Sequence, residues 1–276
     1  MHGTLVAFYM NPEIPKHITD WIRMETSLKT IIQFTQKLLN DSEGKQIEYE
    51  YQRVLHNLIQ RFHLNFVTIH NSWKEYSKNS KFKYPFYLLL RSLLSDFIIM
   101  LYLVDGLSFD KKNKRIDETG FKRRFIEISN SYFTKVQREL RALIADKKIS
   151  AKQMKKFLDK EREFYPEQFE QGEKPVVKQM NDLSVGVMIK KLKGSKLKKF
   201  TSIYYHYVYF SQYEHFTVKT EDLNRNERNE EFENFTYVIG YLLVGLNMII
   251  AKIGFDKKYI AELDKISDDF KMKFEK

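Results

Sequence analysis

The chain of 276 residues contains no cysteine, which excludes a disulfide framework and any metal site built on thiolates. A chain without thiols fits a reducing compartment, and we expect the protein in the cytoplasm. It has only ten glycines and five prolines, and so few turn-forming residues argue against a β-rich architecture. It also lacks a glycine-rich phosphate loop, a dinucleotide fingerprint and a His-Glu-x-x-His sequence. The sequence therefore predicts no cofactor and no metal.

Apolar residues are abundant and follow a helical rhythm. They make up 43% of the chain, including 22 Phe and 17 Tyr, which excludes a disordered protein. They recur mostly at spacings of three and four rather than alternating. The sequence predicts an all-α fold for residues 1–276, a single bundle of about eight or nine helices. A tightly packed protein of two helical lobes is the alternative.

The expected helices can be placed along the chain. Ser150 is a plausible N-cap, and Asp182 or Ser184 can cap a short helix that ends at Gly194. Residues 166–181 carry the weakest pattern and are the candidate exposed connection, and Thr4 to Tyr9 is the only strand-like piece. The longer helices are expected at 16–40, 45–79, 84–104, 119–147, 151–164, 196–216, 230–254 and 255–276.

Two of these helices are long and apolar, and we expect them at the centre of the bundle. Residues 235–251 hold no charge, but seventeen residues is the short limit for a membrane span. The run at 84–104 contains Arg91 and Asp96, each unfavourable by about 2.5–3.5 kcal/mol at a bilayer centre. A signal peptide is not expected, because no basic segment precedes the apolar residues 4–9 and no clear cleavage site follows them. Buried helices are therefore expected rather than a membrane span.

The positive charge is concentrated in the middle of the chain. Residues 101–200 hold 25 basic and 14 acidic side chains, a net +11, whereas residues 1–100 carry +3 and residues 201–276 carry −3. Such a local excess can attract an anionic partner. A solvated helical face is the alternative interpretation.

Basic residues are densest in two clusters, Lys122-Arg123-Arg124 and the segment 190–199, which holds six lysines in ten residues. Lysines near a helix C-terminus also relieve its partial negative charge, which is a structural explanation. The functional interpretation is contact with the phosphates of RNA or DNA, or with anionic lipid headgroups. The candidate nucleic-acid-binding residues are Lys122, Arg123, Arg124, Lys190, Lys191, Lys193, Lys196, Lys198 and Lys199.

Arg91 stands in an apolar helix, where a guanidinium is unfavourable unless an acceptor meets it. Asp96 lies about 140° round the same helix, since each residue turns by about 100°, so it cannot easily pair with Arg91. An acceptor from elsewhere in the fold is needed. The candidates lie on the apolar helix at 196–216, where Ser211 and His215 are four residues apart and share a face.

The sequence thus predicts a polar centre of Arg91, Asp96, Ser211 and His215. In the functional interpretation Arg91 binds an anion, His215 acts as general acid or base and Ser211 orients it. In the structural interpretation the same residues form a network that locks helix register in a large apolar core. A serine nucleophile is disfavoured, because no Gly-x-Ser-x-Gly elbow surrounds Ser211.

Three histidines, His56, His63 and His70, repeat every seven residues along one expected helix. Seven residues advance the helix by about 10.5 Å, so neighbouring members cannot chelate one ion. We expect histidines at the edge of the core, each with a hydrogen-bond partner.

The segment Asp182-Leu183-Ser184-Val185, a short helix ending at Gly194, and Tyr207-x-x-Phe210-Ser211-x-x-x-His215-Phe216-Thr217 together resemble an all-helical bacterial domain family of unknown function. Leu90-Arg91-Ser92-Leu93-Leu94-Ser95-Asp96 is similar to that family's Arg-x4-acidic helix. The resemblance covers residues 50–250 and implies that Arg91, Asp96, Ser211 and His215 form a shared polar centre.

More distantly, the chain resembles HEPN-type helical ribonucleases and abortive-infection proteins. Those carry Arg-x4–6-His on one helix, and no arginine here stands at that spacing before any of the seven histidines. The leading hypothesis is a bacterial intracellular protein that engages a phosphate-bearing partner such as nucleic acid, in a defence or toxin role. If it is an enzyme, a hydrolase or nuclease-like activity is expected. The alternative is a non-catalytic interaction module, and association into oligomers stays open.

Overall fold

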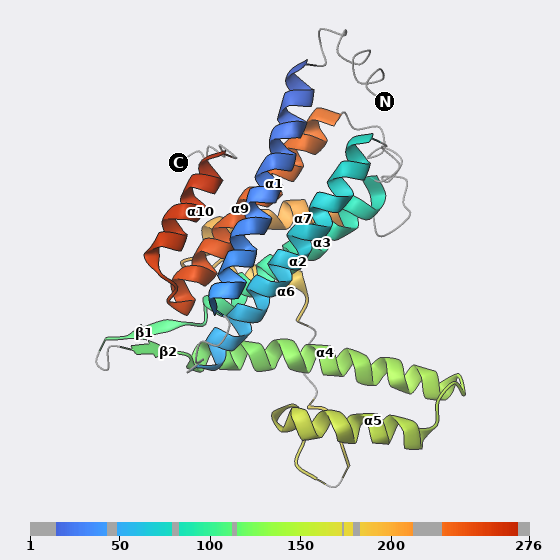
Figure 1. The fold of residues 1–276 in the computed structure, drawn as a ribbon. Helices are drawn as coiled ribbons and strands as arrows, with labels where there is room; N and C mark the ends of the chain where they lie inside the picture. Colours follow the sequence, from blue (N-terminus) through green and yellow to red (C-terminus); the bar gives the residue numbers. More distant parts are fainter. Residues whose placement is uncertain are drawn as a thin grey trace. The chain divides into compact units, whose positions relative to one another are not determined.

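The protein is all-α, as the sequence predicts. The computed structural model describes residues 15–42, 49–78, 83–111, 115–172, 174–178, 183–211 and 228–269. Within these ranges nine α-helices and one small β-hairpin occur (Figure 1). Both expected apolar helices are present, as α3 (Lys83–Val104) and α9 (Arg228–Ile253).

The remaining elements follow in chain order. The segment Thr4 to Tyr9, expected to be strand-like, lies outside the described residues. The α-helices are α1 (Pro15–Ser42), α2 (Glu50–Lys78), α4 (Thr119–Ala145), α5 (Ala151–Phe164), α6 (Val185–Leu192), α7 (Ile203–Ser211) and α10 (Lys257–Asp269), and the 3-10 turns are η3 (Pro166–Gln168) and η4 (Lys198–Phe200).

The hairpin consists of β1 (Ser108–Asp110) and β2 (Arg115–Asp117), which pair antiparallel with Phe109 opposite Ile116. The sequence analysis finds no strand-like piece besides Thr4 to Tyr9, so the hairpin corrects that expectation. Strands of three residues are too short for the alternating pattern to show.

The chain divides into two compact units. The first comprises residues 1–100 and 202–276, and the second comprises residues 101–201. The second is therefore an insertion between two parts of the first. Helix α3 supplies residues to both, since the division falls after Met100.

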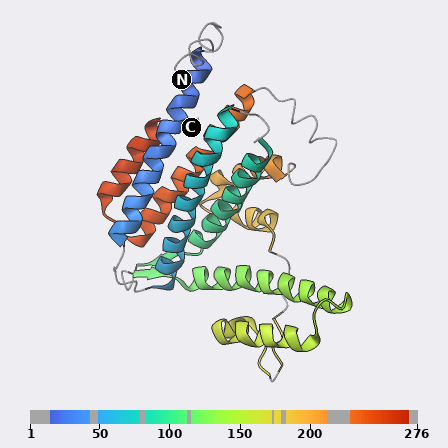
Figure 2. The same cartoon turned by 45° about the vertical axis from the view of Figure 1, so that its right-hand side comes forward.

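Long helices that lie side by side build the first unit. α1 packs on α2, α10 packs on α1 and α9, and α9 also contacts α2 (Figures 1 and 2). Where α2, α3 and α9 meet, Trp73 stacks on Phe235 at 4.6 Å between ring centroids, and Phe86 lies 5.2 Å from Phe235. These three rings are almost fully buried. Aromatic burial of this size is a major contribution to folding.

By length and composition, two helical stretches of the described chain could cross a membrane, Pro85–Val104 and Asn234–Ile253. Of these stretches 67% and 56%, respectively, is buried inside the structure. Buried core helices pass the same test of length and hydropathy.

Gly245 sets how closely α9 approaches α3. A Cβ atom at this position would lie 2.4 Å from Cε2 of Phe97 and 2.8 Å from Cε of Met100. Both neighbours are fully buried. The missing side chain therefore lets the two apolar helices pack closely.

In the second unit α5 lies alongside α4 (Figures 1 and 2). Ser150 caps α5 with a complete capping box, as expected, because its hydroxyl accepts from the Gln153 backbone while the Gln153 side chain accepts from the Ser150 backbone. A small apolar core joins the two helices to the following segment. It consists of Phe133, Leu158, Phe169 and Val177, flanked by Leu140 and Met154.

The segment 166–181 is only partly the exposed connection that the sequence predicts. Phe169 and Val177 form an antiparallel bridge, and both are buried in the small core. Residues 170–172 are exposed, and residues 179–182 lie outside the described residues. Apolar residues too widely spaced for a periodic pattern thus anchor this segment.

The helix expected at 196–216 starts only at Ile203. Before it, the Ser195 hydroxyl accepts from the Leu197 backbone N–H, and the Thr201 hydroxyl donates to the Lys198 carbonyl. Such local bonds compete with helix formation. The shorter α6 begins where expected, with Ser184 as its N-cap.

Candidate functional site

Arg91 meets its acceptor on α7. Its Nε donates to the Ser211 hydroxyl at 2.9 Å, and its Nη2 donates to the Tyr207 hydroxyl at 3.4 Å. The guanidinium also lies 5.4 Å from the centroid of the Tyr207 ring, in cation–π contact. The expectation that the helix carrying Ser211 supplies the acceptor for Arg91 is confirmed.

The Ser211 hydroxyl is fully engaged in this arrangement. It donates to the Tyr207 carbonyl at 2.6 Å, one turn earlier in α7, while it accepts from Arg91. Its proton is therefore directed at the Tyr207 carbonyl. This geometry suits an acceptor that holds an arginine and does not suit an activated nucleophile.

His215 lies outside the described residues. The interaction of Ser211 with His215 therefore stays a prediction.

Asp96 pairs with Arg61 of α2. Two Asp96 oxygens accept from Nη2 of Arg61 at 2.7 and 2.8 Å, and Nε adds a third bond at 3.1 Å. Burial raises the pKa of Asp96, and the bonds from Arg61 and Asn65 offset this only in part. The residues expected to form one centre thus form two pairs with different partners, Arg91 with Ser211 and Asp96 with Arg61.

Arg61 is the residue that sequence reasoning missed. Its side chain is 59% exposed, although the carboxylate that it binds is 8% exposed. An arginine on the polar face of an amphipathic helix carries no signal that distinguishes it from solvated neighbours. Only the buried Asp96, standing in an apolar helix, indicates that a cation must come from outside.

The three heptad histidines all face α1. His56 bonds the Ser42 hydroxyl at 2.7 Å, and Nδ1 of His63 lies 2.8 Å from the Thr35 hydroxyl. His70 lies 3.8 Å from the Glu25 carboxylate. As the histidine numbers rise along α2, the numbers of their partners fall along α1, from Ser42 to Thr35 to Glu25. This order is that of an antiparallel helix pair. The expected hydrogen-bond partner is confirmed for His56 and His63.

Among the described residues, no group of three or more His, Cys, Asp or Glu side chains could hold a metal ion.

Most of the candidate basic residues are exposed, and three of them form ion pairs within the protein. Arg124 binds Asp105 at 2.8 Å, donates to the Tyr102 carbonyl at 2.6 Å and lies 4.6 Å from the centroid of the Tyr102 ring. Lys191 donates to Glu127 at 2.8 Å and to the Tyr102 hydroxyl at 3.0 Å. Lys122 binds Glu118 at 2.6 Å. The exposed candidates are Lys122, Arg123, Lys190, Lys191, Lys193, Lys196, Lys198 and Lys199.

Tyr102, Glu127 and Lys191 form one hydrogen-bonded cluster, in which the Tyr102 hydroxyl also donates to Glu127. Burial raises the pKa of Tyr102. Burial also opposes ionisation of Glu127, but the bonds from Lys191 and Tyr102 outweigh it and lower the pKa of Glu127. The same bonds raise the pKa of Lys191. At neutral pH the cluster is thus a charged Lys–Glu pair with a protonated tyrosine, an anchor between α6 and α4.

No protein-family model, no curated protein and no solved structure matches this chain.

Proposed function

We propose that this protein binds a nucleic acid through the unit of residues 101–201. One observation carries the proposal: the entire charge excess of the chain falls within this unit, whose 25 basic and 14 acidic side chains leave +11. The other unit holds 22 of each sign. A polyanion is the partner that such a field attracts most strongly.

The segment from the end of α6 through η4, residues 190–199, is the proposed centre of the contact. Relief of the α6 dipole accounts for lysines in the last helical turn, Lys190 and Lys191. It does not account for those that follow the helix, because the dipole effect fades within one turn. Besides Lys191, the exposed lysines of this segment are Lys190, Lys193, Lys196, Lys198 and Lys199.

Arg124 and Lys191 are left out of the proposed surface. Arg124 is already paired with Asp105, and Lys191 with Glu127. Breaking these pairs to reach a phosphate would offset much of the gain. Lys191 ties α6, and with it the lysine segment, to Glu127 of α4, whereas Arg124 ties α4 to Tyr102 and Asp105.

The experiment is a salt titration of binding. Fluorescence anisotropy of a labelled single-stranded RNA is followed between about 50 and 200 mM salt. Affinity is expected to fall steeply, and changing Lys190, Lys196, Lys198 and Lys199 together to Gln is expected to reduce the logarithmic slope by about 0.7 for each phosphate that is no longer neutralised. The matched control is Lys257→Gln with Lys265→Gln, two exposed lysines of α10 in the neutral unit. Binding that does not depend on salt, or that the control weakens equally, would contradict the proposal.

We propose that the polar pair of Arg91 and Ser211 serves the fold rather than catalysis. The bond from the Ser211 hydroxyl to the Tyr207 carbonyl supports this, because it engages the hydroxyl proton with the backbone while the oxygen accepts from Arg91. The defence or toxin role and the cytoplasmic location stay predictions.

A further inference from the structure

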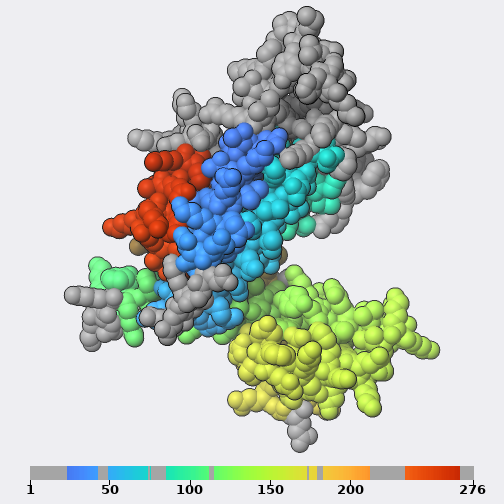
Figure 3. Space-filling view, in the orientation of Figure 1, coloured from blue at the N-terminus to red at the C-terminus, as the bar shows by residue number. Residues whose placement is uncertain are grey.

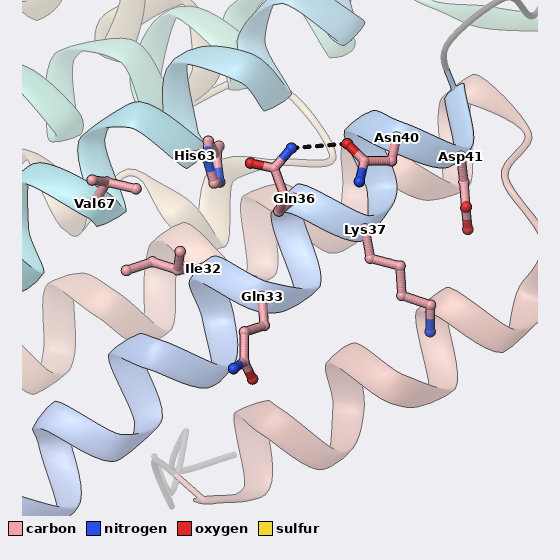
Figure 4. A pocket seen from close by; sticks show the side chains of 8 residues that line it. All are labelled: Ile32, Gln33, Gln36, Lys37, Asn40, Asp41, His63 and Val67. Carbon is pink, nitrogen blue, oxygen red and sulfur yellow. Dashed lines mark hydrogen bonds between the residues drawn. The ribbon is translucent and has the colours of Figure 1, made fainter.

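A shallow cavity of about 530 Å³ lies along the line where α1 meets α2 in the first unit. On the face of this unit drawn in Figure 3, α10, α1 and α2 lie side by side. Figure 4 shows how α1 and α2 share the lining of the cavity. Its residues are Ile32, Gln33, Gln36, Lys37, Asn40 and Asp41 from α1, and His63 and Val67 from α2.

His63 presents a hydrogen-bond acceptor to this cavity. The Thr35 hydroxyl lies within hydrogen-bond distance of the carbonyls of Ile31 and Ile32, at 2.9 and 3.1 Å, and of Nδ1 of His63, at 2.8 Å. We expect its single proton on the helix carbonyls, an arrangement in which the hydroxyl accepts from Nδ1–H of His63. In neutral histidine the other nitrogen, Nε2, then holds a lone pair.

This imidazole is held in its neutral form. Burial lowers the pKa of His63, which is 9% exposed. Nε2 has no hydrogen-bond partner in the part of the chain that the structure describes. A buried acceptor at the edge of a cavity is suited to receive an N–H or O–H donor from a ligand. The contact of Nδ1 with Thr35 holds the ring in this orientation.

The two charged groups of the lining already have partners on α10. Lys37 donates to Glu262 at 2.8 Å, and this bond raises the pKa of Lys37. Asp41 accepts from the Tyr259 hydroxyl. A charged ligand would have to compete with these bonds, so the cavity favours an uncharged one.

Three carboxamides supply matched donors and acceptors. Gln36 donates to Asn40 at 2.9 Å, which leaves the Gln36 oxygen as an acceptor and the Asn40 nitrogen as a donor. Gln33 adds a further carboxamide. Adjacent donor and acceptor groups of this kind match the edge of a heterocyclic base, as Asn and Gln match adenine.

We propose that this cavity binds an uncharged heterocyclic base of the adenine type, as in a nucleoside. The exocyclic amino group donates to Nε2 of His63, the carboxamides of α1 pair with the ring edge, and Ile32 and Val67 pack against the ring face. The volume lies within the range of small-ligand sites, about 300–1,000 Å³.

The test is calorimetric titration of the full chain with adenosine. Saturable binding is expected, and Gln36→Ala combined with Asn40→Ala is expected to weaken it by about fivefold or more, the effect of losing one or two hydrogen bonds. Both residues are exposed, so the fold should tolerate the change. Gln60→Ala, an exposed glutamine of α2 outside the cavity, is the matched control and should leave the affinity unchanged.

Nitrogen NMR of the histidine rings gives a second readout. The ring of His63 is expected as the Nδ1–H tautomer, and its Nε2 resonance should shift when adenosine is added. Absence of saturable binding by folded protein, equal affinity for ribose, or an unmoved Nε2 resonance would each overturn the proposal. Because adenosine carries no phosphate, this result is independent of nucleic-acid binding by residues 101–201.

Discussion

The two units of the molecule differ most in how they handle charge. The first holds 22 basic and 22 acidic side chains, and the second holds 25 and 14. The buried Asp96 pairs with Arg61 in the first unit, and the partly buried Glu127 pairs with Lys191 in the second. Many basic side chains of the second unit are exposed, and like charges on one surface repel each other. The proposed nucleic-acid contact rests on this difference between the units.

The units also differ in their cores. The first buries large rings such as Trp73, Phe86 and Phe235 between long helices. The apolar cluster that joins α4 to α5 has four buried members. Substitutions in the first unit should therefore register mainly in stability, and substitutions on the surface of the second mainly in binding.

The comparison is tested most strongly at two glycines. Gly245→Ala places a methyl group against Phe97 in the first unit and is expected to lower the free energy of unfolding by about 1–3 kcal/mol. Gly194→Ala, in the second unit, meets nothing within 4 Å and should change it by less than about 0.5 kcal/mol. Urea denaturation measures both. Equal losses of stability would mean that the protein is packed no more tightly around Gly245 than around Gly194.

A smaller effect is expected at the polar pair. Ser211→Ala removes the acceptor of Arg91 Nε and should cost about 1 kcal/mol of stability. Nucleic-acid affinity should stay as in the parent protein, because Ser211 lies in the neutral unit. Ser92→Ala, an exposed serine of α3, is the control for chemical denaturation. A loss of affinity without a loss of stability would assign Ser211 a functional role.

The smallest effect is a dependence on pH. Because burial lowers the pKa of His63 below its ordinary value of 6.5, the unfolded chain takes up this proton at a higher pH than the folded one. The contribution of His63 to stability is therefore complete above pH 6.5 and is lost as the pH falls towards its folded-state pKa. The slope is at most about 1.4 kcal/mol per pH unit.

His63→Gln should remove this part of the slope, measured by urea denaturation from pH 8 to pH 5. At pH 8, the difference in free energy of unfolding between the parent protein and His63→Gln gives the part of the stability loss that does not depend on protonation. An unchanged slope would show that His63 titrates alike in both states.

Helix starts could be predicted from the sequence where a capping residue next to the helix specifies them. Ser150 and Ser184 each cap the helix that was expected to follow. The heptad spacing of His56, His63 and His70 indicated one shared face, which the structure places against α1. These features depend on residues a few positions apart.

What the sequence could not show depends on distant partners. Nothing in Arg61 marks it as the partner of Asp96, because the choice is made by the packing of α2 on α3 rather than by spacing. Likewise the bridge between Phe169 and Val177 depends on the small core that both enter. The link from Arg91 to Ser211 was inferable only because a guanidinium in an apolar helix demands an acceptor.

The order of the units along the chain has a consequence for synthesis on the ribosome. Helix α3 emerges more than one hundred residues before its packing partner α9, since residues 101–201 come between. At a translation rate of about 5–20 residues per second, the apolar face of α3 that packs on α9 stays exposed for roughly 6–25 seconds. During this time it is available for chaperone binding, until α9 has been made.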